Sequence, residues 1–361
     1  MPLRAPSCQN ANMKALVLTA NKRLEVLDYA TPVPAPGELL VAVAACGICG
    51  SDVHGYDGSS GRRIPPLIMG HEAAGVVAET GAGITRFHRG DRITFDSTIY
   101  CGECRFCRSG EVNLCDRREV LGVSCGEYRR NGAFAEFVVI PERIAFRLPD
   151  SMPFAEAALL EPAAVALHAV ALSPSDRRDT ALVIGAGMIG LLTMQAARSA
   201  GFKRVLIADI DASRLELAKT LGATDALHAG GSDLVERIQE VTGGVGVDVV
   251  FEAVGRDETV SAAIDAVRKG GTVLLIGNIT PTVKLPLQKV VSRQIRLQGT
   301  AASAGEYTEA IDGIARGTIR VAPLISAVAP LASGPEWFER LYAGAPGLMK
   351  VVLAPGGTSL Q

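Results

Sequence analysis

The spacing of hydrophobic residues changes part-way along the chain. Short apolar runs occupy residues 14–20, 39–46, 73–81 and 91–96, and Pro- and Gly-rich turns such as "TPVPAPGE" separate them. Short strands divided by such turns favour a mostly antiparallel β region. A further strand-like run, "LMKVVLAP", lies at 348–355.

From about residue 180, apolar runs alternate with helical segments. We expect a buried strand, a glycine turn and a helix within 180–201. The same alternation continues through segments at 204–211, 212–223, 247–255, 258–271 and 272–278. Strands that alternate with helices indicate βαβ units and a parallel sheet, so the predicted fold class is α/β.

The chain is long enough for two domains. Its 361 residues exceed what one ordinary hydrophobic core takes. We expect a mainly β region in the N-terminal part, a parallel α/β sheet from about residue 180, and a mixed pattern after about residue 300. Residues 1–12 are expected to form a loose tail, because the first strand-like run starts after Met13.

Composition and charge exclude some function classes. Lys and Arg number 36 against 38 Asp and Glu, and no basic block stands out, so neither nucleic acid nor an anionic membrane is an expected partner. No run approaches the ~18 apolar residues of a membrane span. The N-terminal residues lack a continuous apolar signal segment, so we expect a cytoplasmic protein. In such a reducing compartment, clustered cysteines indicate metal binding rather than disulfides.

One glycine motif predicts a dinucleotide site. "GAGMIG" follows a strand and opens a helix, and Asp209 ends the next strand. This context distinguishes a dinucleotide fingerprint from a glycine turn that binds nothing. A carboxylate at Asp209 would bind the ribose hydroxyls and repel the extra phosphate of NADP, so NAD is favoured, a preference that Arg214 weakens. The predicted cofactor-binding residues are Gly185, Gly187, Met188, Ile189, Gly190, Asp209 and Arg214.

Four cysteines lie in one short loop. They are spaced C-x2-C-x2-C-x7-C, at Cys101, Cys104, Cys107 and Cys115. Four thiolates suit tetrahedral Zn²⁺, and an all-cysteine site of this kind is closed and therefore structural. An iron–sulfur cluster is the rival, but the bacterial ferredoxin run has a shorter last spacing followed by proline.

Other metal-ligating residues are dispersed. Cys49 lies in "GICGSDVH", His71 and Glu72 in "PLIMGHEAAG", and Glu161 in "LLEPAAVALHAV". One thiolate, one imidazole and one or two carboxylates could hold a catalytic zinc with an open position. Spacing alone leaves other interpretations open, among them structural roles for the histidine and the glutamates. For Cys46 and Cys49 it also leaves open a redox pair.

Together these motifs resemble the zinc-dependent medium-chain alcohol dehydrogenases. The closer likeness is to the polyol branch, typified by sorbitol (L-iditol) dehydrogenase, with threonine and butanediol dehydrogenases as neighbours. "GICGSDVH", "GHEAAG", the four-cysteine loop, "LLEP" and "GAGMIG" stand in that family's order. The resemblance runs from about Met13 onwards. It implies a GroES-like β domain at 13–164 and 301–361 that holds both zinc sites. This domain is interrupted at 165–300 by a Rossmann domain, a doubly wound parallel sheet that binds NAD.

The resemblance also implies roles for single residues. Cys49, His71, Glu72 and Glu161 match the metal ligands of the catalytic zinc, and Cys46 becomes a strand residue behind Cys49. Asp52 matches the carboxylate that orients the imidazole ligand. Ser51 and His54 match a proton relay from the substrate to solvent. The implied catalytic residues are therefore Ser51, Asp52, His54 and Glu161.

The implied activity is the oxidation of a secondary alcohol, a polyol or a sugar-like substrate, to a ketone with hydride transfer to NAD. A threonine-, butanediol- or sugar-type dehydrogenase is the alternative within the family. A non-catalytic protein that binds NAD and zinc is the alternative outside it. A small-molecule alcohol is the expected partner, and the family forms homodimers and homotetramers.

The chain departs from the polyol pattern in two places: near residues 302 and 303, and directly after His54, where Gly55 stands and Tyr56 comes one place late. Near Ala302 and Ser303, animal polyol dehydrogenases carry an Arg-Tyr pair, whereas here the residues are small. The pocket wall should therefore differ, and the substrate stays open. The loop "GSSGRRIPP" carries Arg62 and Arg63, which could bind an anionic substrate group or simply form a solvated basic loop.

Overall fold

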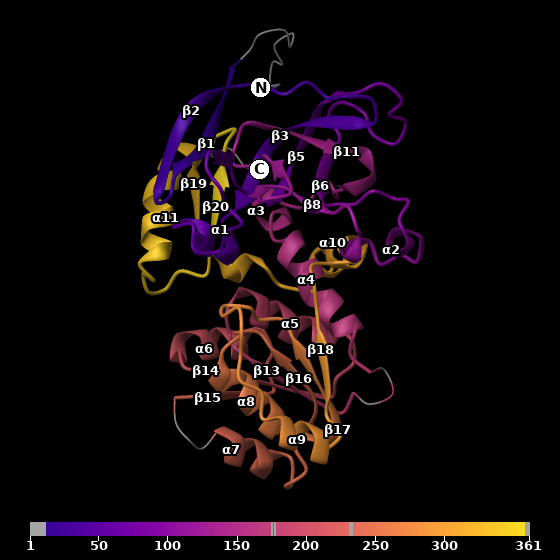
Figure 1. Ribbon diagram of the computed structural model, residues 1–361, viewed down its shortest axis with the longest axis vertical. Helices are drawn as coiled ribbons and strands as arrows, with labels where there is room; N and C mark the ends of the chain where they lie inside the picture. Colours follow the sequence, from indigo (N-terminus) through magenta and orange to yellow (C-terminus); the bar gives the residue numbers. More distant parts are fainter. Residues whose placement is uncertain (1–11, 175, 177, 231–233, 358–361) are drawn as a thin grey trace. The chain divides into compact units, whose positions relative to one another are not determined.

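The structure is a computed structural model, and it describes residues 12–174, 176, 178–230 and 234–357 (Figure 1). Nearly all of the predicted N-terminal tail lies outside these residues, and Asn12 already belongs to the first strand. The chain forms two compact units. The first comprises Met1–Glu161 and Val321–Gln361, and the second is Pro162–Arg320.

The first unit is built on a seven-stranded sheet with the strand order β12-β6-β5-β3-β20-β19, in which β11 also pairs with β3. Apart from the parallel β19–β20 pair, its ladders are antiparallel, as the turn-separated runs predicted. These strands are β3 (Glu38–Gly47), β5 (Glu72–Thr80), β6 (Arg92–Phe95), β11 (Phe137–Pro141), β12 (Ala145–Arg147), β19 (Ile325–Pro330) and β20 (Lys350–Ala354).

Three smaller sheets and short helices complete the first unit. The sheets contain β1 (Asn12–Ala20), β2 (Arg23–Ala30) and β4 (Leu67–Ile68); β7 (Thr98–Ile99) and β8 (Glu119–Val120); and β9 (Val123–Ser124) and β10 (Arg129–Arg130). The helices are α1 (Gly50–Gly55), α2 (Arg105–Arg108), α3 (Phe154–Ala157) and α11 (Gly334–Tyr342), with 3-10 turns at Val112–Leu114, Glu142–Ile144, Ala322–Leu324 and Leu331–Ser333. Helix α4 (Leu160–Ala171) begins in this unit and continues into the second.

Aromatic packing fixes helix α1, which carries several of the predicted catalytic residues. Tyr56 follows the helix directly, and its ring centroid lies 5.6 Å from that of Phe338 on α11. Phe338 packs edge-on against the buried Phe134 at 5.8 Å. The Tyr56 hydroxyl donates a hydrogen bond to the Lys22 carbonyl at 2.8 Å. The C-terminal end of α1 is therefore anchored to the core of the unit.

The second unit contains a six-stranded parallel sheet with the order β15-β14-β13-β16-β17-β18. Counted from β13, this is the order 3-2-1-4-5-6 of a dinucleotide-binding fold, which confirms the predicted fold class. The strands are β13 (Thr180–Ile184), β14 (Arg204–Asp209), β15 (Asp225–His228), β16 (Val247–Glu252), β17 (Val267–Leu275) and β18 (Arg296–Gly299). The helices are α5 (Met188–Ser199), α6 (Ala212–Thr220), α7 (Leu234–Val241), α8 (Asp257–Ala266), α9 (Leu287–Ser292) and α10 (Tyr307–Ala315).

The division between the units differs from the predicted boundary at residue 301, because the chain re-enters the first unit only at Val321. Two polar contacts hold the intervening segment within the second unit. His168 Nδ1 lies 2.8 Å from Glu306 Oε1, and the Arg320 amide donates to Gln195 Oε1 at 2.7 Å. None of the helices in the described ranges is long and apolar enough to cross a bilayer.

Candidate metal centres and nucleotide-binding loop

Cys49 stands at the N-terminal end of helix α1. It is the N-cap residue, and its Sγ accepts a hydrogen bond from the Ser51 amide at 3.5 Å. In turn, the Cys49 amide donates a hydrogen bond to Asp52 Oδ2 at 3.4 Å, which completes a capping box. Backbone amides at a helix N-terminus favour negative charge, so this position suits a thiolate.

Cys46, the other cysteine of the C-x-x-C, is placed differently. It lies on strand β3 with no exposed surface, as predicted. Burial raises the pKa of its thiol well above the ordinary value. Its Sγ also faces Gly70, where a Cβ would come within 2.9 Å. Cys46 is therefore a packing residue behind the site.

Asp52 is the centre of a buried polar cluster. Arg63 donates to Asp52 Oδ1 through Nε at 3.1 Å and through Nη2 at 2.9 Å. His71 Nδ1 lies 3.5 Å from the same oxygen. Burial alone would raise the pKa of Asp52, but His71 and Arg63 hold it well below its usual range. The carboxylate is therefore charged and orients both the imidazole and the guanidinium.

His71 and Glu72 lie where the chain enters strand β5. One ligand atom each from Cys49, His71 and Glu72 lies within 4.8 Å of the other two. Gly47 leaves the space for Glu72, since a Cβ there would stand 2.3 Å from Glu72 Oε2. Lys350 donates to both Glu72 oxygens, at 2.8 and 2.6 Å, and to the Ile48 carbonyl. Burial lowers the pKa of Lys350, but the neighbouring Glu72 raises it, and the net shift is above the ordinary value, so Lys350 keeps its ammonium charge.

Glu161 lies at the start of α4, beside this group but outside it. Its Oε1 accepts a hydrogen bond from the Ser97 hydroxyl at 3.0 Å. Burial and the nearby Glu72 raise its pKa, whereas His71 lowers it. Among the described residues, the close group contains Cys49, His71 and Glu72 without Glu161. The role of Glu161 as a ligand stays a prediction.

Ser51 and His54 are three residues apart on α1, a spacing that brings side chains to the same helix face. Both residues are exposed. The Ser51 hydroxyl accepts a hydrogen bond from Arg63 Nη2 at 3.3 Å. This arrangement is compatible with a proton path from Ser51 towards His54 and solvent.

The donor set around Cys49 fits a divalent metal. It combines a cysteine sulfur that accepts from a helix amide, an imidazole 3.5 Å from a carboxylate, and a second carboxylate in a space that Gly47 provides. These are zinc ligand types, and the carboxylate behind the histidine is the usual outer partner of such a ligand.

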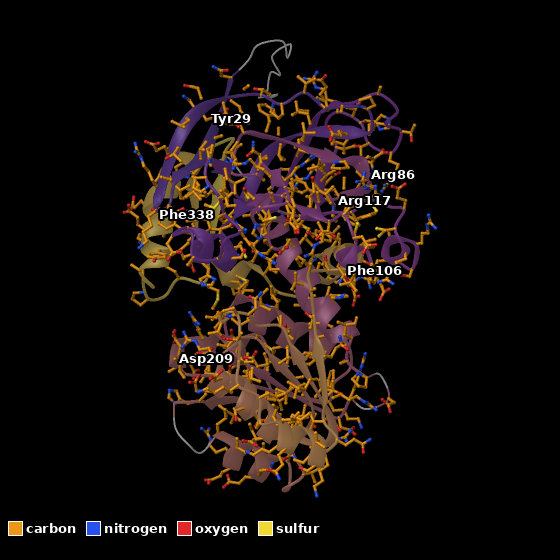
Figure 2. The ribbon with its side chains drawn as sticks, viewed as in Figure 1. Tyr29, Arg86, Phe106, Arg117, Asp209 and Phe338 are labelled. Atoms are coloured by element: carbon orange, nitrogen blue, oxygen red, sulfur yellow. The ribbon has the colours of Figure 1, made fainter. Side chains whose placement is uncertain are left out.

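The four-cysteine loop surrounds helix α2, near the labelled Phe106 and Arg117 (Figure 2). Cys107 Sγ lies 3.9 Å from Cys101 Sγ and 3.5 Å from Cys104 Sγ. A tetrahedral Zn²⁺ with bonds of about 2.3 Å requires sulfur separations of roughly 3.8 Å. The loop therefore has nearly the spacing that a bound zinc ion needs.

Backbone amides of the loop are directed at the sulfurs. The Glu103 and Cys104 amides donate to Cys101 Sγ, and they lower its pKa to about 6. In contrast, burial and the neighbouring thiols raise the pKa of Cys107 to about 12. Without a bound cation, the four thiols are therefore not readily deprotonated at the same time. A central divalent cation would remove this conflict.

The glycine motif joins β13 to α5. Gly185 has a positive φ of 100°, and a Cβ on Gly190 would stand 1.7 Å from the Gly185 carbonyl oxygen. Gly187 is the N-cap of α5 and supplies no side-chain cap, so first-turn amides remain available for an anion. Met188 and Ile189 form the first turn of α5. The predicted loop therefore has the geometry of a pyrophosphate site.

Asp209 ends strand β14 as predicted (Figure 2). Its Oδ2 accepts a hydrogen bond from the Ala186 amide, and its Oδ1 accepts one from the Asp211 amide. Each carboxylate oxygen keeps a further acceptor site for a ribose hydroxyl. Arg214, on the first turn of α6, lies 3.6 Å from Asp211 and is partly exposed.

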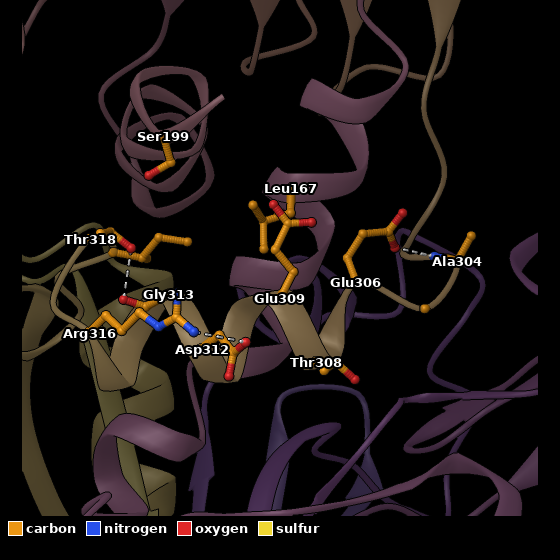
Figure 3. A pocket seen from close by; sticks show the side chains of 12 residues that line it. Leu167, Ser199, Ala304, Glu306, Thr308, Glu309, Asp312, Gly313, Arg316 and Thr318 are labelled. Carbon is orange, nitrogen blue, oxygen red and sulfur yellow. Dashed lines mark hydrogen bonds and ion pairs between the residues drawn. The ribbon is translucent and has the colours of Figure 1, made fainter. Parts of the chain in front are cut away.

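A cavity of about 760 Å³ lies elsewhere in the second unit (Figure 3). It is lined by α10 and the short segments on either side of it, together with Leu167 and Ser199. Its walls contain none of the predicted site residues, so it is separate from the nucleotide-binding loop.

Sequence reasoning missed two partners of the site, Lys350 and Ser97. No sequence motif marks either residue, because only the fold brings Lys350 to Glu72 and Ser97 to Glu161. The pair of arginines was noticed, but the structure separates their roles. Arg63 is buried on Asp52, whereas the Arg62 side chain is exposed. The interpretation of Arg63 as part of a solvated basic loop was therefore wrong, and a substrate-binding role for either arginine stays untested.

The fold and these donor sets define a zinc-type, dinucleotide-dependent dehydrogenase, and comparison with known proteins agrees. The family described as alcohol dehydrogenase GroES-like domain matches residues 35–150, and the family described as zinc-binding dehydrogenase matches residues 189–316. Sorbitol dehydrogenase of Bacillus subtilis is 31% identical, covering 95% of this chain and 98% of its own. L-Idonate 5-dehydrogenase of Vitis vinifera is 34% identical, covering 87% of each.

Solved structures give the same result. A Sinorhizobium meliloti protein described as a zinc-binding dehydrogenase, bound to NADP, has 35% identity and a TM-score of 0.88, covering 96% of this chain and 100% of its own. An Escherichia coli alcohol dehydrogenase complexed with NADH has 27% identity and a TM-score of 0.87, with the same coverage. The chain belongs to the zinc-dependent alcohol dehydrogenase family, in its polyol dehydrogenase-like branch, as the sequence motifs predicted.

Replacing Cys104 tests the structural zinc loop. Cys104→Ser should remove about one zinc per chain and lower the melting temperature, since the loop then lacks one thiolate and its sulfurs are no longer neutralised. Metal analysis and thermal unfolding measure both effects. A variant with unchanged zinc content and melting temperature would show that the loop is not a structural metal site.

A matched pair of cysteine variants tests the other centre. Cys49→Ala should lose about one zinc and at least about 100-fold in turnover, because it removes a ligand at the proposed catalytic centre. Cys46→Ala, three residues away and buried, should keep both zincs and most of its activity. Equal effects of the two substitutions would contradict the assignment of Cys49.

Proposed function

We propose that this protein oxidises a secondary alcohol of a polyol or sugar-like substrate to a ketone, with hydride transfer to NAD. The observation that carries the proposal is the grouping of Cys49, His71 and Glu72 within 4.8 Å, beside a relay-type serine. Cys49 and His71 would hold the catalytic zinc, with Glu72 or Glu161 completing its shell. A second zinc would be held by Cys101, Cys104, Cys107 and Cys115.

The chain's own residues define the proton path. Bound zinc acts as a Lewis acid that makes the substrate hydroxyl more acidic. The Ser51 hydroxyl can accept the released proton while it passes its own proton towards His54. His54 is exposed and can deliver that proton to solvent. Asp52 keeps the His71 ring in one orientation throughout.

Glu72 has a second role in this account. Its two oxygens are held by the Lys350 ammonium, so a ligand bond from Glu72 competes with a buried ion pair. Glu72 would therefore be a weaker metal ligand than Cys49 or His71. Glu161, with one oxygen held by Ser97, stands as the second carboxylate beside the group.

The cofactor proposal rests on the second unit. NAD supplies the hydride acceptor, and the loop from Gly185 to Gly190 would bind its pyrophosphate at the start of α5. Asp209 favours NAD, because its carboxylate would repel the 2′-phosphate of NADP. Arg214 could attract that phosphate, but Asp211 already lies 3.6 Å from its guanidinium.

The substrate class follows from the relatives and from the altered pocket wall. Relatives act, by their names, on sorbitol and L-idonate, which are polyhydroxylated chains. The residues here at 302 and 303 are Ala and Ser, in place of the Arg-Tyr pair of animal polyol enzymes. We therefore propose a polyhydroxylated substrate without assigning it to sorbitol.

The zinc-loaded protein should reduce NAD with one class of polyol or sugar acid. A panel of sugar alcohols, aldoses, sugar acids, vicinal diols and threonine, each with NAD and with NADP, measures this by NADH absorbance. We expect turnover with NAD to exceed turnover with NADP at least about 10-fold, through the charge of Asp209. Silence across the panel, with both zincs present and NADH bound, would favour a non-catalytic protein.

We also propose that the protein forms a homodimer or homotetramer. Large apolar side chains are exposed between Ile279 and Val291, and Leu287 and Val291 on α9 expose 61% and 70% of their surface. Strand β18, at the edge of the parallel sheet, follows directly. An apolar surface beside a sheet edge suits a second copy of the same chain.

Charged substitutions in this segment test the assembly. Leu287→Glu combined with Val291→Glu should reduce the mass measured by light scattering to that of a smaller species. Val33→Glu, at an exposed apolar residue of the first unit, is the control and should leave the mass unchanged. A wild-type monomer, or a double variant of unchanged mass, would contradict the proposal.

A further inference from the structure

Arg63 is buried in the first unit, although it lies in a loop of exposed residues. Only 5% of its surface is accessible, whereas Arg62 and Ile64 on either side are exposed. Gly55 of α1 makes the space, because a Cβ there would stand 2.3 Å from Arg63 Cγ. A parallel bridge between Arg63 and Ser124, and a hydrogen bond from the Ser124 amide to the Arg62 carbonyl, hold the loop backbone.

The guanidinium has three acceptors. Nε and Nη2 donate to Asp52 Oδ1, Nη2 also donates to Ser51 Oγ at 3.3 Å, and Nη1 donates to the Arg62 carbonyl at 3.1 Å. Arg63 thus joins the carboxylate that orients His71 to the hydroxyl of the proposed relay. The planar guanidinium can span both, whereas a lysine ammonium is a single point charge.

The contact with Ser51 determines how that hydroxyl can act. A serine hydroxyl has one proton to donate and two lone pairs to accept with. Arg63 occupies one lone pair, which leaves the other for the proton of a substrate hydroxyl. The serine proton must then point away from the arginine, and His54 is one turn further on the same helix. The guanidinium therefore excludes the orientation in which the hydroxyl proton faces Arg63, and it leaves one lone pair to accept from substrate.

We propose that Arg63 is the positioning residue of the proton relay, fixing the Ser51 hydroxyl so that it accepts from substrate and donates towards His54. The inference rests on the proposed alcohol oxidation. Arg63 itself neither touches substrate nor takes up a proton. Its effect should appear in kcat rather than in the binding of NAD or zinc.

The test compares Arg63→Met with Arg62→Met in the zinc-loaded protein. Arg63→Met removes every donor but keeps an apolar chain beside Gly55, and it should lower kcat at least about 10-fold with little change in KM. Arg62→Met should behave as wild type. Zinc content and the visible spectrum of the cobalt-substituted protein should stay unchanged in both, because the metal ligands are intact.

Two further measurements separate positioning from a structural role. Guanidinium at millimolar concentration should partly restore kcat to Arg63→Ala. In a double-mutant cycle, Arg63→Met should have little further effect once Ser51→Ala has removed the hydroxyl. If Arg63→Met does not fold, the same measurements are made on Arg63→Lys. A lysine keeps a positive charge beside Asp52 but cannot donate to Ser51 at the same time.

The outcomes are distinct. A full kcat loss from Arg63→Met in the Ser51→Ala background would overturn the positioning role, because Arg63 would then act on the site only through Asp52. A changed cobalt spectrum would overturn it as well, and either result would leave the proposed function standing. Wild-type turnover by Ser51→Ala would instead overturn the relay within the proposed function.

Discussion

The ionised carboxylate of Asp52 holds the proposed catalytic site together. Its Oδ1 accepts two hydrogen bonds from Arg63 and lies beside His71. Its Oδ2 accepts one from the amide of Cys49, the N-cap of helix α1. A buried carboxylate is costly unless it is fully paired, and breaking such a pair typically costs about 3–5 kcal/mol. The Cys49 amide and the His71 ring contact this carboxylate directly, and Arg63 links it to the Ser51 hydroxyl.

A second buried ion pair complements the first. Lys350 on β20 neutralises Glu72 on β5, and the two strands flank β3, which leads to Cys49. The site thus combines two buried cations with two buried carboxylates before any metal is counted. A divalent cation held by Cys49 and His71 would add its positive charge beside two ion pairs, Arg63–Asp52 and Lys350–Glu72, whose own charges already cancel. This explains why Glu72 can stand close to a metal without being obliged to bind it.

The sequence predicted the features that depend on neighbouring residues. The glycine loop, Asp209 and the four-cysteine loop all lie within short segments, so the spacing of their residues in the sequence is enough to predict their local geometry. The antiparallel region and the parallel sheet followed from the length and alternation of the apolar runs. The family motifs also indicated the pair Cys49 and His71.

Features that depend on tertiary contacts could not be predicted in this way. Lys350 is 278 positions from Glu72, and only the fold brings the two together. Arg63 resembles Arg62 in the sequence, and its burial depends on the missing side chain of Gly55. The later return to the first unit, at Val321, depends on polar contacts of Glu306 and Arg320 that no local pattern reveals.

Anomalous scattering at the zinc edge, from crystals of the purified protein, tests the central claim most directly. The account predicts two zinc peaks per chain, one bonded to Cys49 and His71 and one among Cys101, Cys104, Cys107 and Cys115. A protein that is active on a polyol but has no peak beside Cys49 and His71 would contradict it.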